Sequence, residues 1–393
     1  MKGGFTMSIS SVKWKPIVRR VLLVLSPLSL ILLLEVILRV GGFIWHDYSR
    51  YYLFYGFHNL VGRVGVSPWI TDTGQYYKFP PRYVLRGAAG QSEETAAINN
   101  QGFRGPDFEP AKPAGTFRVI CMGESSTFGF HNRDTETYPF QLEKLFQEQH
   151  QGVRVEVINA GFPYYNTGSI LSLLKAELLG FKPDVLTVYS AYNDAAWPLH
   201  VGNATRVATW LQDHSMTYLV MKRTILTDEF VMKWQGRIAR GLLRQNPSRE
   251  AFEANTTQVV ARYRRNVKDI IAIARSRGVP IILIKQPMTA KFNDILSGYS
   301  RSYEEEYREL VKKFNAKRDL SPVEYQLLSQ HRVVEELEAI AREENVELVD
   351  NVALVDRNRR AMASYVHLTA AANLALAEAL KEVIEKLLPR ARQ

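Results

Sequence analysis

Cysteine is nearly absent from this chain of 393 residues, which contains only Cys121. A single thiol excludes an intramolecular disulfide and any metal site built from several cysteines. Cys121 lies in the apolar run Val119–Met122, and an unpaired cysteine in such surroundings usually packs as a small hydrophobic residue. We therefore expect Cys121 to belong to the core rather than to a reactive site.

Motifs for nucleic acids and nucleotides are also missing. The sequence has no zinc-finger spacing and no aromatic RNA-binding motif. Neither GxxxxGK[ST] nor GxGxxG follows a predicted strand, so no phosphate-binding loop, cofactor or metal is expected. The net charge of +10 does not favour nucleic acid as a partner, because half of the excess lies in residues 1–50, with seven Lys/Arg and two Asp/Glu.

Charge is scarce in one stretch, residues 21–40, which read VLLVLSPLSLILLLEVILRV. This length suits a helix that spans the hydrocarbon core of a bilayer. The basic residues before it are Lys13, Lys15, Arg19 and Arg20, whereas only Arg39 and Arg50 lie at or beyond its other end. This asymmetry predicts a cytoplasmic tail of residues 1–20, one transmembrane helix, and an exoplasmic (periplasmic or extracellular) remainder.

A cleavable signal peptide is the alternative for this segment. The apolar run is long for a signal peptide, and Gly41-Gly42-Phe43-Ile44 is a poor cleavage site, so a retained anchor is favoured. Residues 41–116 are expected to form an exoplasmic segment and linker. Its aromatic part, 48–83, suits either the headgroup layer or a small cap on the main domain. Residues 86–116, which include INNQGFRGP, are rich in Gly, Ala and Pro and indicate a linker.

Apolar strands alternate with amphipathic helices from residue 117 onward. The predicted strands are 117–122, 153–158, 184–189, 280–284 and 346–349. The predicted helices are 139–149, 168–179, 259–277, 302–316, 322–344 and about 370–388. This alternation predicts an α/β domain over residues 117–393, with a parallel sheet covered by helices on both faces. Residues 197–257 interrupt it and are expected to form a mostly helical insertion.

Polar residues and glycines follow three of the predicted strands. The three stretches are Gly123-Glu124-Ser125-Ser126, Asn159-Ala160-Gly161 and Ser190-Ala191-Tyr192-Asn193-Asp194, and His367 lies just before the last helix. Sites in open parallel sheets form beyond the carboxyl ends of the strands. A serine, an N–H group in a tight glycine turn, an Asn amide and a histidine are the groups that acyl transfer requires. Each alone is typical of a turn or helix cap; their combination predicts a nucleophilic site.

These stretches, with Val366-His367-Leu368-Thr369, resemble the SGNH hydrolase family, also called GDSL-type esterases and lipases, over roughly residues 98–388. INNQGFRGP and GTFRVICMGESSTFG resemble its bacterial membrane-anchored branch. The resemblance implies a three-layer α/β/α, flavodoxin-like fold with a five-stranded parallel sheet. It also implies Ser125 as nucleophile, His367 as base, and Gly161 and Asn193 as oxyanion donors beside the Ser125 N–H.

Family members act on acyl and acetyl esters of lipids and carbohydrates, and some transfer acetyl groups onto extracellular polysaccharides. With the predicted anchor, the resemblance implies an exoplasmic serine esterase or O-acyl/acetyltransferase that acts on envelope carbohydrates or lipids. Components of envelope polysaccharide assembly are then candidate partners. The alternative is a catalytically inactive SGNH domain that binds glycans or serves in an envelope complex.

Four positions depart from the family pattern. Glu124 replaces Asp in the GDS motif, and Ala191 replaces the Gly of GxND. Tyr164 stands where family members often have a second Gly, shortly after the stretch Asn159-Ala160-Gly161. Family members have the motif DxxH, with an Asp three residues before the histidine, whereas this chain has Ser364 at that position. Ser364 could orient the histidine through its hydroxyl, Asp356 could substitute for the missing acid, or a backbone carbonyl could complete a Ser–His dyad.

Overall fold

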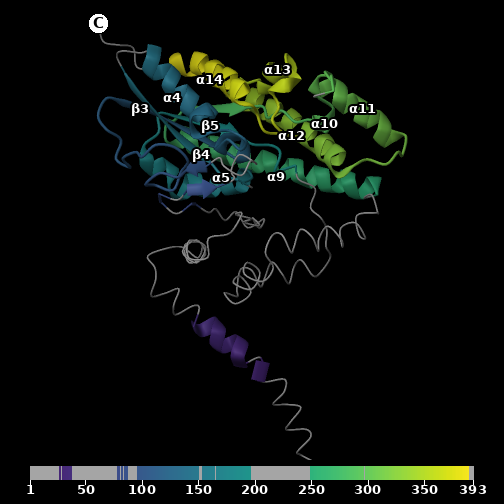
Figure 1. Ribbon diagram of the computed structural model, residues 1–393, viewed down its shortest axis with the longest axis horizontal. Coiled ribbons are helices and arrows are strands. Elements are labelled where there is room, and N and C mark those ends of the chain that lie inside the picture. Colours follow the sequence, from purple (N-terminus) through teal and green to yellow (C-terminus); the bar gives the residue numbers. More distant parts are fainter. Residues whose placement is uncertain are drawn as a thin grey trace, which may run out of the picture. The chain divides into compact units, whose positions relative to one another are not determined.

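The computed structural model describes residues 26–27, 29–37, 78–79, 81–82, 84–86, 95–149, 153–163, 165–195, 248–295 and 297–388. The chain divides into two compact units, one made of residues 1–65 and 200–238 and the other of residues 66–199 and 239–393. Nearly all described residues belong to the second unit, which is an α/β domain (Figure 1).

The α/β domain contains a five-stranded parallel sheet in the order β4-β3-β5-β6-β7. Its strands are β3 (Thr116–Gly123), β4 (Arg154–Gly161), β5 (Val185–Tyr189), β6 (Ile281–Ile284) and β7 (Glu347–Val349). The predicted α/β fold with a five-stranded parallel sheet is confirmed. This strand order is that of flavodoxin-like sheets, in which β3 lies beside the point where the order reverses. Residues at the carboxyl end of β3 therefore face a natural crevice.

Helices cover both faces of this sheet (Figure 1). One face carries α4 (Tyr138–Gln149) and α14 (Ala370–Glu385), and the other carries α5 (Thr167–Ala176) and α9 (Arg249–Ser276). The central strands β3, β5 and β6 are buried along their whole length, as expected for a parallel sheet covered on both faces. Cys121 lies in the core cluster between β3 and α4, as expected from its neighbours.

Two further strands and five further helices complete the described part of the domain. They are β1 (Val84–Arg86), β2 (Thr95–Ala97), α3 (Ser125–Phe128), α10 (Phe292–Ile295), α11 (Tyr303–Asn315), α12 (Pro322–Glu344) and α13 (Asn351–Asp356). Short 3-10 helices occupy Asp134–Glu136, Leu178–Phe181 and Arg359–Ala361. Helices α11 and α12 begin with Ser302 and Ser321, and each of these serines forms a capping box with a glutamate three residues later.

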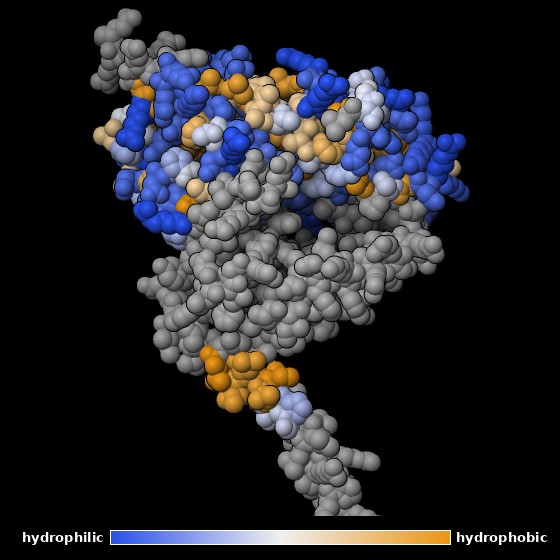
Figure 2. Space-filling model, in the orientation of Figure 1, coloured by the Kyte–Doolittle hydropathy of each residue, from blue (hydrophilic) through white to orange (hydrophobic). Residues whose placement is uncertain are grey.

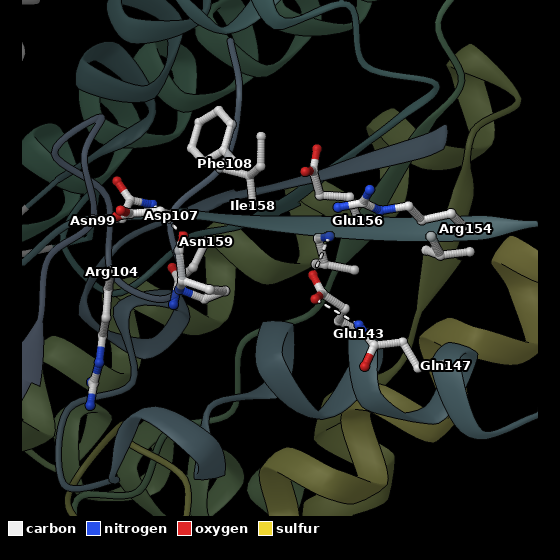
Figure 3. Close-up of a pocket in the computed structure, with 13 residues that line it drawn as sticks. Asn99, Arg104, Asp107, Phe108, Glu143, Gln147, Arg154, Glu156, Ile158 and Asn159 are labelled. Carbon is white, nitrogen blue, oxygen red and sulfur yellow. Dashed lines mark hydrogen bonds between the residues drawn. The ribbon is translucent and has the colours of Figure 1, made fainter. Parts of the chain in front are cut away.

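Residues 95–116 differ from the predicted linker, because they pack onto the domain. Phe103 and Arg104 are buried, and Arg104 forms an antiparallel bridge with Asn159 at the outer edge of β4. The Glu143 carboxylate accepts the Val157 N–H of the same edge at 2.7 Å. A pocket of about 210 Å³ lies between β4, α4 and residues 99–108 (Figure 3). Its lining does not include Ser125 or His367.

Part of the predicted transmembrane segment is described. Residues 29–37 are helical, and their apolar side chains, among them Leu30 at 68% exposure, lie open to the surface (Figure 2, orange). Within the described ranges, no helix is both long and apolar enough to cross a membrane. Residues 21–25, 28 and 38–40 lie outside the described residues, as do residues 197–247 of the predicted insertion; residues 249–257 form the start of α9.

Candidate active site

A sharp turn at the end of β3 presents the serine cluster. Gly123 is required there, because an added Cβ would lie 2.0 Å from Thr127 Oγ1 and 2.6 Å from Tyr189 O. After Glu124 the chain makes a single turn of helix, α3, which ends at Gly129 with a left-handed φ of 93°. Ser125 is thus the first residue of a short helix at the carboxyl end of the sheet.

The three hydroxyl residues of α3 point to different surroundings. Ser125 is half-exposed, whereas Ser126 and Thr127 are buried. Ser126 Oγ accepts from Gln286 Nε2 at 3.0 Å, and Thr127 Oγ1 lies 3.3 Å from Tyr138 OH. Ser126 and Thr127 therefore serve the packing of α3, and Ser125 alone reaches the surface.

His367 lies in a tight loop that precedes α14. Met362 and Leu368 form a bridge, and the Ala363 N–H donates to the His367 carbonyl at 2.7 Å. Thr369 then caps α14 by accepting the Ala372 N–H. This loop holds His367 Nε2 2.9 Å from Ser125 Oγ, so the structure brings the predicted nucleophile and base together.

The other nitrogen of the imidazole faces Ser364. Ser364 Oγ lies 2.7 Å from His367 Nδ1 and accepts the backbone N–H groups of His367 at 3.1 Å and Val366 at 3.3 Å. A hydroxyl can donate to an imidazole nitrogen or accept from it, so this contact orients the ring in either tautomer. In the tautomer with hydrogen on Nδ1, Nε2 is free to accept the Ser125 proton.

The imidazole is held neutral by its surroundings. Burial lowers the pKa of His367 to about 3, and the neighbouring His131 adds to this effect. One edge of the half-buried ring still reaches the surface. A neutral imidazole at neutral pH is the form that a general base needs.

The structure does not bring Asp356 to His367. The Asp356 carboxylate accepts the Tyr303 N–H at 3.0 and 3.2 Å and pairs with Arg359 Nη1 at 3.0 Å. It therefore caps the start of α11 instead of facing Nδ1. Asp350 is also engaged, because it caps α13 and pairs with Lys285 at 2.9 Å.

Asn193 lies in a turn after β5 that two buried side chains bind. Glu124 Oε2 accepts the Asn193 N–H at 3.0 Å, and Glu124 Oε1 accepts those of Ala191 and Tyr192 at 3.2 and 3.1 Å. Gln286 Oε1 accepts the latter two as well, at 2.8 and 2.7 Å. No motif indicates a role for Gln286, which lies 160 positions from the Ser126 hydroxyl that it binds.

Two acidic groups near this turn are fully buried. Burial and the nearby Asp194 carboxylate raise the pKa of Glu124 to about 8, while the bound N–H groups act in the opposite direction. Asp194 accepts the Thr167 hydroxyl at 2.6 Å and the Ser190 hydroxyl at 3.0 Å, and burial raises its pKa too. The polar residues that follow β5 therefore form a closed hydrogen-bond network beneath Asn193.

The predicted oxyanion donors are placed differently from one another. The Asn193 side-chain amide donates one hydrogen to Tyr165 O at 2.8 Å, which leaves its second hydrogen for another acceptor. The Gly161 N–H donates to Asn159 Oδ1 at 3.0 Å, and a Cβ on Gly161 would lie 2.3 Å from Phe128 N. Gly161 thus lets β4 pass beneath α3, and its N–H would have to leave Asn159 to serve an oxyanion.

Metal ligands are not clustered in this part of the chain. Among the residues that the structure describes, no group of three or more His, Cys, Asp or Glu side chains could hold a metal ion. The chemistry of the site is therefore derived from Ser125, His367 and their hydrogen-bond partners.

Comparison with known proteins identifies the family. A lipase/acylhydrolase from Enterococcus faecalis is 16% identical and aligns over 70% of this chain and 100% of its own, with a TM-score of 0.40. An acetylxylan esterase from Geobacillus stearothermophilus is 13% identical over 70% and 97%, with a TM-score of 0.39. A comparison with curated protein sequences found no match. The family profile described as GDSL-like Lipase/Acylhydrolase matches residues 121–375, well over half of the sequence. The chain therefore belongs to the GDSL-like lipase/acylhydrolase family, whose members are also called SGNH hydrolases.

Proposed function

We propose that the protein is a serine esterase or O-acyltransferase that uses Ser125 as nucleophile and His367 as base. The observation that carries this proposal is the position of the imidazole, with Nε2 2.9 Å from Ser125 Oγ and Nδ1 2.7 Å from Ser364 Oγ. A nucleophile that contacts a base, which is oriented in turn by a third group, is the arrangement that activates a serine.

In the first step, Ser125 Oγ attacks the carbonyl carbon of an ester while its proton passes to His367 Nε2. The tetrahedral intermediate places negative charge on the former carbonyl oxygen, which needs hydrogen-bond donors. The Ser125 N–H lies in the first turn of α3, where a helix N–H has no acceptor within the helix. The second hydrogen of the Asn193 amide is the other donor that we propose.

The intermediate then collapses to an acyl-enzyme. The proton on His367 passes to the departing alkoxide, and the acyl group remains on Ser125 Oγ. In the second step, His367 takes a proton from water or from an acceptor alcohol, whose oxygen attacks the acyl carbon. The bond from that carbon to Ser125 Oγ then breaks, and His367 returns the proton to Ser125. Water gives a free acid, which is hydrolysis, and an alcohol gives a new ester, which is acyl transfer. This mechanism uses the tautomer with hydrogen on Nδ1 and Ser364 Oγ as its acceptor, so that Nε2 serves both steps.

A catalytically inactive domain that binds glycans is the second candidate. It is favoured by one observation, which is that a hydroxyl instead of a carboxylate faces Nδ1. A hydroxyl orients the ring but contributes little to stabilising an imidazolium. We favour the enzyme, because a binding module would not require the hydrogen bond between Ser125 and His367.

We also propose that the protein is anchored in a membrane with the α/β domain on the exoplasmic side. The proposal rests on the apolar run 21–40, the basic residues before it, and the exposed apolar side chains of helical residues 29–37. Esters on envelope carbohydrates or lipids are the substrates that such a location would offer, and envelope polysaccharide-assembly proteins the partners. A reporter fused after residue 60 is expected to be exoplasmic; a cytoplasmic signal would contradict the anchor orientation.

Hydrolysis of a short-chain acetyl ester tests the catalytic proposal. Ser125→Ala is expected to abolish turnover, whereas Ser126→Ala, which removes a buried hydroxyl of the same turn, is expected to retain it. Equal loss in both variants would contradict the assignment of Ser125. Absence of activity in the parent protein on all acyl esters tested, with or without an acceptor alcohol, would favour the binding module.

A further inference from the structure

The loop after α3, residues 129–132, is held rigidly over the site. The buried Arg104 guanidinium donates to Phe128 O at 3.0 Å, Gly129 O at 2.8 Å and Asn132 O at 2.7 Å. The Asn132 amide donates to Phe130 O and to Leu368 O, both at 2.9 Å. The second bond ties this loop directly to the residue after His367.

The clamped loop carries His131 in an unusual backbone conformation. Its φ is 66°, in the left-handed region that residues other than glycine rarely adopt. Such conformations cost free energy and persist where surrounding contacts enforce them, often at functional sites. Here the contacts place an exposed imidazole with its ring centre 5.1 Å from that of His367. Phe130 fills the adjoining position, with its ring centre 5.5 Å from His367.

Few charged groups act on His367. From α3 it faces the Ser125 hydroxyl, and from its own loop it faces the Ser364 hydroxyl. The nearest carboxyl along the chain from Ser125 is Glu124, which is bound to backbone N–H groups of the Asn193 turn. Within the described part of the protein, His131 supplies the only charge that shifts the pKa of His367.

Other charged groups lie beside His131. Arg104 is permanently charged and pairs with Asp134 at 2.7 Å, and Arg133 and Glu136 lie in the turn that follows. Histidine is the side chain whose charge ordinarily changes between pH 5 and 8. A positive charge on His131 disfavours a second positive charge on the His367 ring, whose centre lies 5.1 Å away.

We propose that His131 is an electrostatic positioning residue that, together with the burial of the ring, keeps His367 neutral, and therefore able to act as a base, as the pH falls. This inference rests on the proposed function of His367. The left-handed conformation of residue 131 serves this role, because it brings the His131 imidazole beside the base. His131 touches no reacting atom in this role and acts through His367 alone.

The test is the titration of His367 in the full-length protein, labelled with ¹⁵N-histidine and followed by NMR. His367→Gln assigns the signal. His131→Asn removes the charge while keeping a residue that tolerates positive φ, and His131→Arg keeps a permanent charge. Lys144→Gln, which removes an exposed positive charge on α4, is the control.

In His131→Asn the midpoint of the His367 titration is expected to rise by about half a pH unit or more, as a charge near 5 Å in a solvent-like medium requires. It should not rise in His131→Arg or Lys144→Gln. The acid limb of kcat/KM should move by the same amount in His131→Asn, with little change in activity at pH 8. An unchanged His367 midpoint in His131→Asn would overturn the proposal, as would an equal loss of activity at every pH. Because the NMR midpoint needs no turnover, it remains decisive if the protein hydrolyses no ester.

Discussion

At the scale of single residues, Ser364 determines how well His367 can act as a base and therefore how fast the site turns over. Its hydroxyl lies 2.7 Å from His367 Nδ1 and orients the ring, but it carries no charge to balance an imidazolium. In a Ser-His-Asp triad, replacing the acid by its amide costs about 10⁴ in turnover, largely through the wrong tautomer. Because Ser364 Oγ can accept the Nδ1 hydrogen of the catalytic tautomer, we expect slow but genuine catalysis.

Replacing Ser364 tests this account. An Asp at this position can accept the same backbone N–H groups, so Ser364→Asp is expected to raise kcat roughly tenfold or more by adding the missing charge. Ser364→Ala, which removes the acceptor, is expected to lower kcat. Asp356→Asn is the control, since Asp356 caps α11 and should affect stability more than kcat. If Ser364→Asp left kcat unchanged while Asp356→Asn abolished it, the orienting role of Ser364 would be wrong.

Asn193 gives a second prediction at this scale. Asn193→Ala is expected to reduce kcat by about 10²–10³, the usual cost of one oxyanion donor. Asn100→Ala is the comparison, because its amide donates to Phe108 O at 3.1 Å away from Ser125 and His367. Steady-state rates on one acetyl ester measure both. A loss in Asn193→Ala no larger than that in Asn100→Ala would indicate that Asn193 only shapes its turn.

At the scale of elements, the segment 95–116 is the main difference from the sequence prediction. The motif INNQGFRGP contributes a buried arginine, Arg104, which donates to the end of α3, to the loop after it and to Asp134. This segment fixes the loop that carries Phe130 and His131, so it belongs to the support of the site.

Arg104→Met tests the importance of this clamp. It leaves three buried carbonyl groups and Asp134 without their partner, so we expect a loss of about 3–5 kcal/mol of stability. Arg82→Met is the matched control, because Arg82 forms an exposed pair with Asp107 at 3.1 Å and such pairs contribute about 0–1 kcal/mol. Denaturant titration of both variants gives the comparison. Similar small losses would mean that the loop does not depend on Arg104.

Local patterns account for what the sequence predicted and for what it did not. The five strands follow apolar β-branched runs, and α11 and α12 begin at capping-box serines, so these elements carry their own signals. Ser125 and His367 were found through motifs that occupy the ends of elements. Gln286 and Arg104 act over long sequence separations, through contacts that no local pattern encodes. The hydrogen bond from the Gly161 N–H to Asn159 Oδ1 is local, two residues apart on β4, but the family motif did not indicate it.

At the scale of the whole molecule, buried acids couple folding to pH. The pKa of Glu124 is raised above its ordinary value of 4.5 to about 8. A carboxyl whose pKa is raised on folding contributes stability that is fully present below pH 4.5 and is lost as the pH rises through about 8. Burial also raises the pKa values of Asp194 and Glu306, so these carboxyl groups shift the stability of the folded protein in the same direction as the pH rises.

Glu124→Gln isolates one of these groups. Gln cannot accept all three backbone N–H groups, which costs stability equally at every pH. Because Gln cannot ionise, the melting temperature of the variant relative to the parent should rise by at least about 2 °C between pH 5 and pH 9. Glu148→Gln on the exposed surface of α4 should show no such change. A difference that stayed constant with pH would contradict the inferred protonation of Glu124.

The claim on which the whole account depends is that His367 activates Ser125, and covalent labelling by a fluorophosphonate tests it most directly. Peptide mapping of the labelled full-length protein is expected to find one modified residue, Ser125. Labelling should disappear in Ser125→Ala and in His367→Gln and persist in Ser126→Ala, whose hydroxyl is buried against Gln286. Label on another residue, or label that survives in Ser125→Ala, would contradict the account.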